Sequence, residues 1–156
     1  MATKTLTPQQ AREKIKRYCA YQERCHQEVR DKLYSFGLYR DDVDEILSEL
    51  ITENFLNEER FARTFAGGKF RLKKWGRLKI TDALSAKGVS QNCIRMALTE
   101  IDEEDYLLTL EDLIIRKRAM LDVDDLFVLR DRISRYLIQK GFEPDLVWKT
   151  LRKLIP

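Results

Sequence analysis

The chain has 156 residues, of which 44% are hydrophobic and 35% are charged, with 29 Lys and Arg against 26 Asp and Glu. This hydrophobic fraction can support a folded core, which excludes general disorder. Six glycines and three prolines are too few turn formers for a many-stranded sandwich or barrel. A single histidine excludes histidine-rich metal sites and weakens most enzyme interpretations. The composition therefore predicts helices joined by short connections.

The first three predicted helices lie in the N-terminal third of the chain. Residues 8–20 are predicted to form the first, because Thr7 and Gln10 have the spacing of a capping box and a proline stands at the first helical position. The second is predicted to end at Gly37, since glycine tolerates the left-handed conformation that closes a helix. The third is predicted to begin at Asp41, where acidic residues complement the helix dipole.

The next helix is predicted to begin after Asn57, a favoured N-cap residue. Its end is ambiguous, because Gly67 and Gly68 each cost about 1 kcal/mol relative to alanine inside a helix. The sequence allows two alternatives, a helix that stops near Ala66 and one that continues, weakened, to about Lys74.

The remaining predicted helices follow the same signals. One ends at Gly88, and Ser90 caps the helix after it. Asp102 opens a further helix with acidic residues in its first turn. The last two are separated by Gly141 and restart at Pro144.

The three helix-ending glycines are centres of an internal repeat. They lie 51 and 53 residues apart, and apolar residues recur around them at helical spacing. The aligned positions are Val29, Ile80 and Ile133; Leu33, Leu84 and Leu137; Leu38, Val89 and Phe142; Val43, Ile94 and Val147; Leu47, Leu98 and Leu151; and Leu50, Ile101 and Leu154. The sequence predicts an all-α protein of three tandem three-helix units, residues 1–54, 55–101 and 102–156, stacked in an elongated, curved array.

Targeting and cofactor signals predict a cytoplasmic protein without a cofactor. No stretch of 18 uninterrupted apolar residues is present, and residues 1–8 lack the apolar core of a secretion signal. A metal site could be considered at Cys19, Cys25 and His26. Its fourth ligand would have to be Cys93 or a carboxylate, and the spacing of these residues is not that of a zinc motif. We expect buried thiols in a reducing compartment, with no metal, no cofactor and no membrane contact.

Catalytic signatures are absent as well. The chain contains no GxxxxGK[ST], GxGxxG, HExxH or GxSxG motif. Its many carboxylates stand where helices begin, and the helix dipole already accounts for them there. The sequence predicts a binding protein and not an enzyme.

Charge is segregated along the chain. Residues 41–59 carry eight acids and no base, residues 60–80 carry eight bases and no acid, and residues 99–115 carry seven acids and no base. Such blocks are typical of interaction surfaces, although a solvated helix face is the simpler explanation.

Within the basic block, Phe70 and Trp75 alternate with cations, a pattern that suits contact with phosphates and bases. The rings can equally pack inside the second unit while the cations only keep its rim soluble. A second basic cluster lies in the third unit. The residues predicted to contact a partner are Lys69, Arg71, Lys73, Lys74, Arg77, Lys79, Arg130, Arg132 and Arg135.

Four segments in fixed order resemble the RecX family of bacterial regulators of the RecA recombinase. They are residues 56–62 (LNEERFA), 74–80 (KWGRLKI), 83–89 (ALSAKGV) and 136–142 (YLIQKGF). The resemblance extends over about residues 10–156.

This resemblance implies a non-enzymatic inhibitor of RecA that lies in the groove of the RecA–single-stranded DNA filament and can touch its DNA. We also expect the chain to be a monomer. DNA repair, recombination and the SOS response would be affected. Two alternatives stay open: an autonomous DNA-binding protein built from helix-turn-helix-like units, and a scaffold for an unrelated protein. The acidic blocks count against the first, because they would repel a long duplex.

Overall fold

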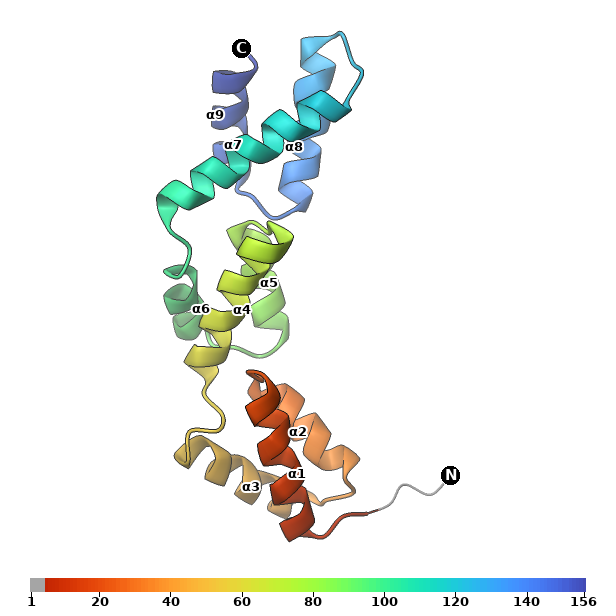
Figure 1. Ribbon diagram of the computed structural model, residues 1–156, viewed down its shortest axis with the longest axis vertical. Helices are drawn as coiled ribbons and strands as arrows, with labels where there is room; N and C mark the ends of the chain where they lie inside the picture. Colours follow the sequence, from red (N-terminus) through yellow and green to blue (C-terminus); the bar gives the residue numbers. More distant parts are fainter. Residues whose placement is uncertain (1–4) are drawn as a thin grey trace.

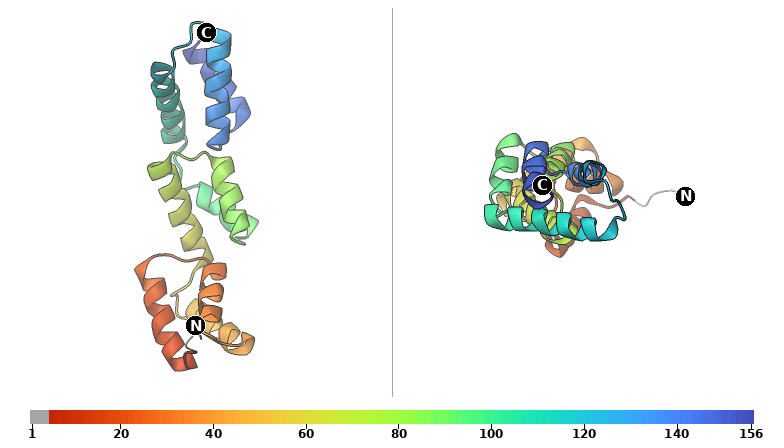
Figure 2. Two further views of the ribbon diagram at one scale, coloured as in Figure 1. Left: turned by 90° about the vertical axis from the view of Figure 1, so that its right-hand side faces the viewer. Right: turned by 90° about the horizontal axis from the view of Figure 1, so that it is seen from above.

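The computed structural model describes residues 5–156, and within them it contains nine α-helices and no strands. Figure 1 shows the helices grouped in threes along one long axis, and the turned views in Figure 2 show the same stacked arrangement. The predicted all-α fold with three three-helix repeats is confirmed. The helices are α1 (Pro8–Tyr21), α2 (His26–Ser35), α3 (Arg40–Thr52), α4 (Glu58–Lys73), α5 (Arg77–Ala86), α6 (Gln91–Leu98), α7 (Glu103–Met120), α8 (Leu126–Gln139) and α9 (Pro144–Leu154).

We refer to α1–α3, α4–α6 and α7–α9 as the first, second and third units. The predicted divisions after residues 54 and 101 fall in the connections between them, and residues 1–4 of the first predicted unit lie outside the described residues. Each helix packs mainly against the two others of its own unit. The units therefore touch one another only at their ends.

The helix starts follow the predicted caps. The Thr7 hydroxyl accepts a hydrogen bond from the backbone N–H of Gln10, whose side chain accepts one in return from the backbone N–H of Thr7. Side chains of Asn57, Ser90 and Asp102 likewise accept backbone hydrogen bonds at the starts of α4, α6 and α7. These caps satisfy N–H groups that have no partner inside the helix.

Helix α4 runs through both of its glycines and ends at Lys73, so the second of the two alternatives is correct. The helix buries one long face, including Ala66, Gly67 and Phe70, against the rest of the second unit. Burial of this apolar face offsets the conformational cost of the two glycines.

Each predicted glycine ends its helix in the left-handed conformation, with φ of +85° at Gly37, +80° at Gly88 and +98° at Gly141. The leucine four residues before each glycine is completely buried. The apolar residue directly after each glycine is also buried. The local repeat thus builds the same helix–turn–helix corner three times.

The buried side chains form two cores. One belongs to the first unit, whereas the second and third units share a continuous core that also takes in Cys25 from the first unit. Burial raises the pKa of Cys19 to about 11, so this thiol stays neutral. No group of side chains in residues 5–156 could hold a metal ion at the Cys19, Cys25 and His26 positions or elsewhere.

Backbone contacts join the second unit to the third. The N–H of Gly76 donates to the carbonyl of Lys140 at 2.8 Å, and the N–H of Leu78 donates to the carbonyl of Gly141 at 2.9 Å. A β-carbon at Gly76 would overlap the main chain of Gly141. Only glycine allows the two main chains to approach this closely.

The N-terminal segment makes an equivalent contact on the first unit. The N–H of Leu6 donates to the carbonyl of Phe36 at 2.9 Å, and Phe36 precedes Gly37 as Lys140 precedes Gly141. Leu6 therefore occupies, at the outer end of the first unit, the place that Gly76 takes on the third.

Candidate partner-binding surface

Lysine ammonium groups and aromatic rings alternate in a row across the second and third units. In the second unit two ammonium groups lie near the half-buried ring of Trp75, with Lys69 Nζ 4.9 Å and Lys79 Nζ 4.6 Å from the ring centroid. Lys69 also lies over Phe65, whose ring meets that of Trp75 edge-on. On the other side of this cluster, Lys87 Nζ lies 5.9 Å from the Phe65 ring centroid.

The row continues in the third unit around Tyr136. Lys117 Nζ of α7 lies 4.3 Å from the Tyr136 ring centroid, and Lys140 Nζ at the end of α8 lies 5.7 Å from it. Cations over ring faces are attracted by about 0.5–1 kcal/mol at exposed sites. We call this set the lysine–aromatic surface: Phe65, Lys69, Trp75, Lys79, Lys87, Lys117, Tyr136 and Lys140.

Lys140 connects the two halves. Its Nζ donates to the backbone carbonyl of Lys73 at 3.1 Å, across the junction of the two units. Partial burial, together with the nearby positive charge of Lys79, lowers the pKa of Lys140. Neither lysine has an acidic partner among residues 5–156, and two cations held close together are suited to binding an anion.

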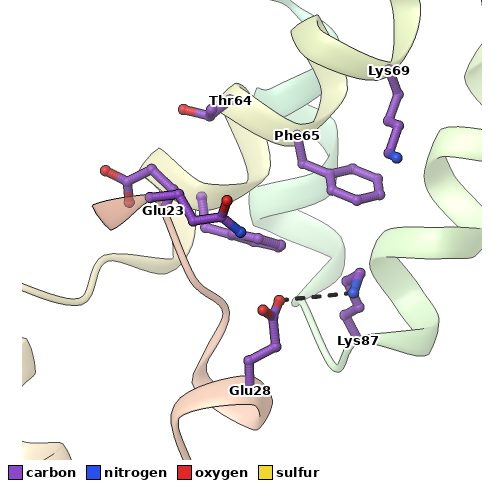
Figure 3. Close-up of a pocket in the computed structure, with 8 residues that line it drawn as sticks. Glu23, Glu28, Thr64, Phe65, Lys69 and Lys87 are labelled. Atoms are coloured by element: carbon purple, nitrogen blue, oxygen red, sulfur yellow. Dashed lines mark ion pairs between the residues drawn. The ribbon is translucent and has the colours of Figure 1, made fainter. Parts of the chain in front are cut away.

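A cavity of about 330 Å³ lies at the first-unit end of this surface. Figure 3 shows the Phe65 ring between Lys69 and Lys87, with Glu28 of α2 reaching toward Lys87 from the opposite wall. Glu28 and Lys87 form an ion pair at 3.7 Å. This pair ties the first unit to the second and marks the end of the row of cations.

The basic residues predicted along α4 divide between two faces. Lys69 and Lys73 line one hollow beside Phe65, on the side of the lysine–aromatic surface. Arg71 and Lys74 line a different hollow, which they share with Asp105 and other residues of α7. The structure thus brings Lys69, Lys73 and Lys79 together and leaves the other two on the opposite side.

Arg77 is directed into the junction between the second and third units. Its guanidinium donates to Glu143 at 2.8 Å and also pairs with Glu103, while its backbone N–H donates to the Tyr106 hydroxyl. Burial alone would lower the pKa of Arg77, but hydrogen bonding and the charge of Glu143 outweigh burial and raise it. Arg77 holds the junction together, and its role in partner contact stays a prediction.

Glu143 accepts hydrogen bonds from both Arg77 and the Tyr106 hydroxyl. Burial raises the pKa of this carboxyl, and the two hydrogen bonds reverse the effect and leave the pKa lowered. The pKa of Tyr106 is raised, first by burial and then by its hydrogen bond to Glu143. The carboxylate therefore stays ionised inside the junction.

The three arginines predicted in α8 point in different directions. Arg130 donates to the carbonyl of Ile155 at 3.1 Å, at the outer end of the molecule. Arg135 pairs with Asp131 in its own helix at 3.2 Å. Arg132 is exposed and stands four residues before Tyr136, so it alone shares the face of the lysine–aromatic surface.

Six members of the lysine–aromatic surface were not among the residues predicted to contact a partner: Phe65, Trp75, Lys87, Lys117, Tyr136 and Lys140. One signal for them is present in the repeat, because Lys87 and Lys140 both directly precede a helix-ending glycine. Lys117 belongs to the first helix of its unit and has no counterpart in that alignment.

Comparison with known proteins gives consistent matches. The family model described as "RecX, second three-helix domain" matches residues 57–98. A regulatory protein RecX of Clostridium perfringens (strain SM101 / Type A) is 34% identical over 129 residues, covering 81% of this chain and 60% of the relative. Another, from Prosthecochloris aestuarii, is 29% identical and covers 88% of this chain and 89% of the relative. The chain thus spans 60% of the length of the Clostridium relative.

Two solved structures have the same fold. The crystal structure of RecX from Lactobacillus salivarius superposes with a TM-score of 0.86 at 24% identity, covering 94% of this chain and 96% of that one. A second crystal structure, of a regulatory protein RecX, gives a TM-score of 0.84 at 19% identity, covering 94% of this chain and 71% of that one. Among the described residues, no helix has the length and apolar character that a membrane crossing requires.

Proposed function

Since the chain belongs to the RecX family, we propose that it is a non-enzymatic regulator that inhibits the RecA recombinase by binding in the groove of the RecA–single-stranded DNA filament. The family match, with relatives named as regulatory proteins, supports regulation of RecA. The observation that carries the proposed mode of binding is the lysine–aromatic surface. DNA repair, recombination and the SOS response would all be reduced by such binding.

The chemistry of this surface suits single-stranded DNA held in a protein filament. Ammonium groups neutralise phosphates, while an aromatic ring offers a face on which any base can stack. Lys69 and Lys79 both lie within 5 Å of the Trp75 ring centroid, so an aromatic ring and two cations are presented together. An ordered arrangement of this kind needs little rearrangement on binding, which favours affinity.

The elongated array supplies the required reach. The surface begins at Lys87 in the second unit and continues to Lys117 in the third, so it presents several contacts in a row. A filament presents the same protomer surface repeatedly along its axis. Several charge contacts with successive protomers would fix the position of this chain along the filament. We propose that the chain acts as a monomer in the cytoplasm and contacts both RecA and DNA.

The test measures the ATPase activity of RecA on single-stranded DNA during titration with this protein. We expect the wild-type chain to inhibit, and the double variant Lys79→Glu, Lys140→Glu to need a roughly tenfold higher concentration, because two adjacent cations become anions. The matched control is Arg71→Glu, Lys74→Glu, which makes the same charge change on the opposite face of the second unit. Circular dichroism confirms that each variant is folded.

The outcomes distinguish the alternatives. Absence of inhibition by the wild-type chain at micromolar concentrations would refute RecA regulation. Loss of inhibition only in the control variant would move the contact to the opposite face. Tight binding to naked DNA, with a salt slope of about −0.7 for each phosphate neutralised on a single strand, would instead support an autonomous DNA-binding protein.

A further inference from the structure

A groove lined only by cations and aromatic rings lies between α1 and α2 of the first unit. Figure 2 shows these two helices side by side. The groove has a volume of about 410 Å³, and it follows α1 from Lys14 to Tyr21, seven residues or about 10 Å along the helix. The Tyr21 side chain is 83% exposed. The lining residues are Lys14, Arg17, Tyr18, Tyr21, Arg24, Lys32 and Phe36.

The four cations of α1 divide between two faces. On one face, carboxylates of α3 neutralise Arg12 at 2.8 Å and Lys16 at 3.2 Å. Lys14 and Arg17 are exposed on the groove side, and among residues 5–156 no carboxylate lies within 4 Å of either charged group. The first unit thus compensates half of the charge of this helix and leaves the other half free at the groove.

Two more cations lie over the rings of the groove. The guanidinium carbon of Arg24, in the connection between the two helices, is 3.7 Å from the Tyr18 ring centroid. Arg24 Nε also donates to the backbone carbonyl of Tyr18 at 3.1 Å, which holds the guanidinium over the ring. Lys32 Nζ of α2 lies 5.5 Å from the Tyr18 centroid and 5.8 Å from that of Phe36. The cations and rings are therefore already arranged before a partner binds.

Two carboxylates stand at the second-unit end of the groove, and both are shared with cations of the second unit. Glu28 lies 4.0 Å from Arg24 and 3.7 Å from Lys87. Glu23 is bound by Arg60. These acids offset part of the charge of Arg24 and leave the other three cations of the groove uncompensated.

Two further acids lie on neighbouring faces of the helices and do not line the groove. Glu13 directly precedes Lys14 and so projects about 100° away from it around α1. Asp31 stands in the same relation to Lys32 on α2, and its carboxylate accepts a hydrogen bond from Gln27. With these acids turned aside, the groove keeps a positive charge.

We propose that this groove binds a segment of single-stranded nucleic acid, as a contact separate from the lysine–aromatic surface. The inference rests on the proposed function, in which the chain contacts the DNA of the filament. Phosphates would lie on Lys14, Arg17 and Lys32, and a base would stack on the exposed ring of Tyr21.

The lining favours a single strand over the other polyanions. An acidic protein segment would bring apolar side chains, and the groove has no aliphatic residue to receive them. A duplex keeps its bases stacked on one another, so it would make no use of the Tyr21 ring. Only a single strand uses both the cations and the rings.

The test is a titration of the chain, labelled with nitrogen-15, with hexathymidylate, followed residue by residue from the amide shifts in NMR spectra. RecA is left out. We expect saturable shifts at residues 14–24 and 32–36, with a Kd of about 1–100 μM, the range of non-specific binding. Shifts at the lysine–aromatic surface are read from other residues, so the two contacts are measured separately.

Charge reversal tests the phosphate contacts. On a single strand each neutralised phosphate contributes a salt slope of about −0.7, which corresponds to about fivefold in affinity at 0.1 M salt. Arg17→Glu should therefore raise the Kd read from the groove at least fivefold. The matched control is Arg40→Glu, an exposed arginine of α3 that lies outside the groove and pairs with Asp44 in its own helix, and it should bind as the wild-type chain does.

Replacement of the exposed ring tests the base contact. Tyr21→Ala should weaken binding at the groove about fivefold or more, because a stacking face is lost. Tyr21→Phe keeps the ring and should retain the wild-type affinity. Circular dichroism confirms that each variant is folded.

Shifts confined to the lysine–aromatic surface, or equal affinities of Arg17→Glu and Arg40→Glu, would overturn the proposal. Equal or tighter binding of hexaaspartate at the groove would identify an acidic protein segment as its partner and would overturn it too. Inhibition of RecA by a chain whose groove gives no shifts would refute this inference and leave the proposed function in place. Saturable groove shifts from a chain that does not inhibit RecA would support the strand site and refute the proposed function alone.

Discussion

Replacement of Arg77 by alanine is expected to destabilise the protein, although the sequence places this arginine among the partner-binding cations. The side chain is only 21% exposed and lies in the junction between the second and third units. Its guanidinium carbon lies 3.8 Å from the Tyr106 ring centroid, in addition to the pairs with Glu143 and Glu103. The variant removes all three interactions together.

Each interaction contributes a modest amount. The half-buried pair with Glu143 at 2.8 Å contributes about 1 kcal/mol, and the contact with Tyr106 about 0.5–1 kcal/mol. The pair with Glu103 is largely exposed and adds a few tenths of a kcal/mol at most. Glu143 keeps its hydrogen bond from Tyr106, so the carboxylate is not left without a partner. The free energy of unfolding should therefore fall by about 2 kcal/mol, or roughly 4–8 °C in Tm.

The assay is urea and thermal unfolding followed by circular dichroism at neutral pH. Arg71→Ala is the matched control, because it removes the same charge from an exposed position in the same unit and is expected to change stability by less than about 0.5 kcal/mol. If Arg77→Ala is as stable as Arg71→Ala, the junction does not depend on this arginine and the reasoning is wrong.

Three further predictions concern the core, the glycine turns and the half-buried carboxylate of Glu143. Leu84 is completely buried, so Leu84→Ala should cost about 2–5 kcal/mol in urea unfolding, and a cost below 1 kcal/mol would show that the site collapses around the cavity. Gly88→Ala and Gly141→Ala both meet the penalty of a left-handed backbone, but a β-carbon at Gly141 would also overlap Lys79, whereas nothing lies within 4 Å at Gly88. The Gly141 variant should thus be the less stable of the two, and equal stabilities would contradict the close contact between the units. Because the pKa of Glu143 is lowered in the folded state, its contribution to stability is present above the unfolded value of about 4.3 and is lost as the pH falls through the folded pKa. Unfolding free energies measured between pH 7 and pH 3 should therefore fall less steeply in Glu143→Gln than in the wild-type chain.

Local features of the sequence were sufficient to predict the helices. A capping residue such as Asn57 and a closing residue such as Gly88 act on the few residues around them, so their effect can be recognised without the fold. The length of α4 was the exception. It depends on burial of Ala66 and Phe70 against other helices, and the cost of Gly67 and Gly68 gives no measure of that burial.

The binding surface was only partly predictable because charge alone does not give direction. Lys69 and Lys73 share one face of α4 while Arg71 lies on another, and this division follows only if the helix continues past its glycines. The role of Arg77 was hidden for a different reason. Its partner Glu143 lies 66 residues away in sequence, and no local pattern joins the two.

The contact between Gly76 and Gly141 has a consequence for how such a protein can evolve. Main-chain hydrogen bonds, which do not depend on the identity of any surface side chain, help to hold the second unit on the third, together with the Arg77 pairs and the shared core. Mutations that change the lysines and rings near this junction can therefore alter what the surface recognises while the relative orientation of the two units is retained. Partner choice can diverge in a lineage of this kind without a change in the shape of the molecule.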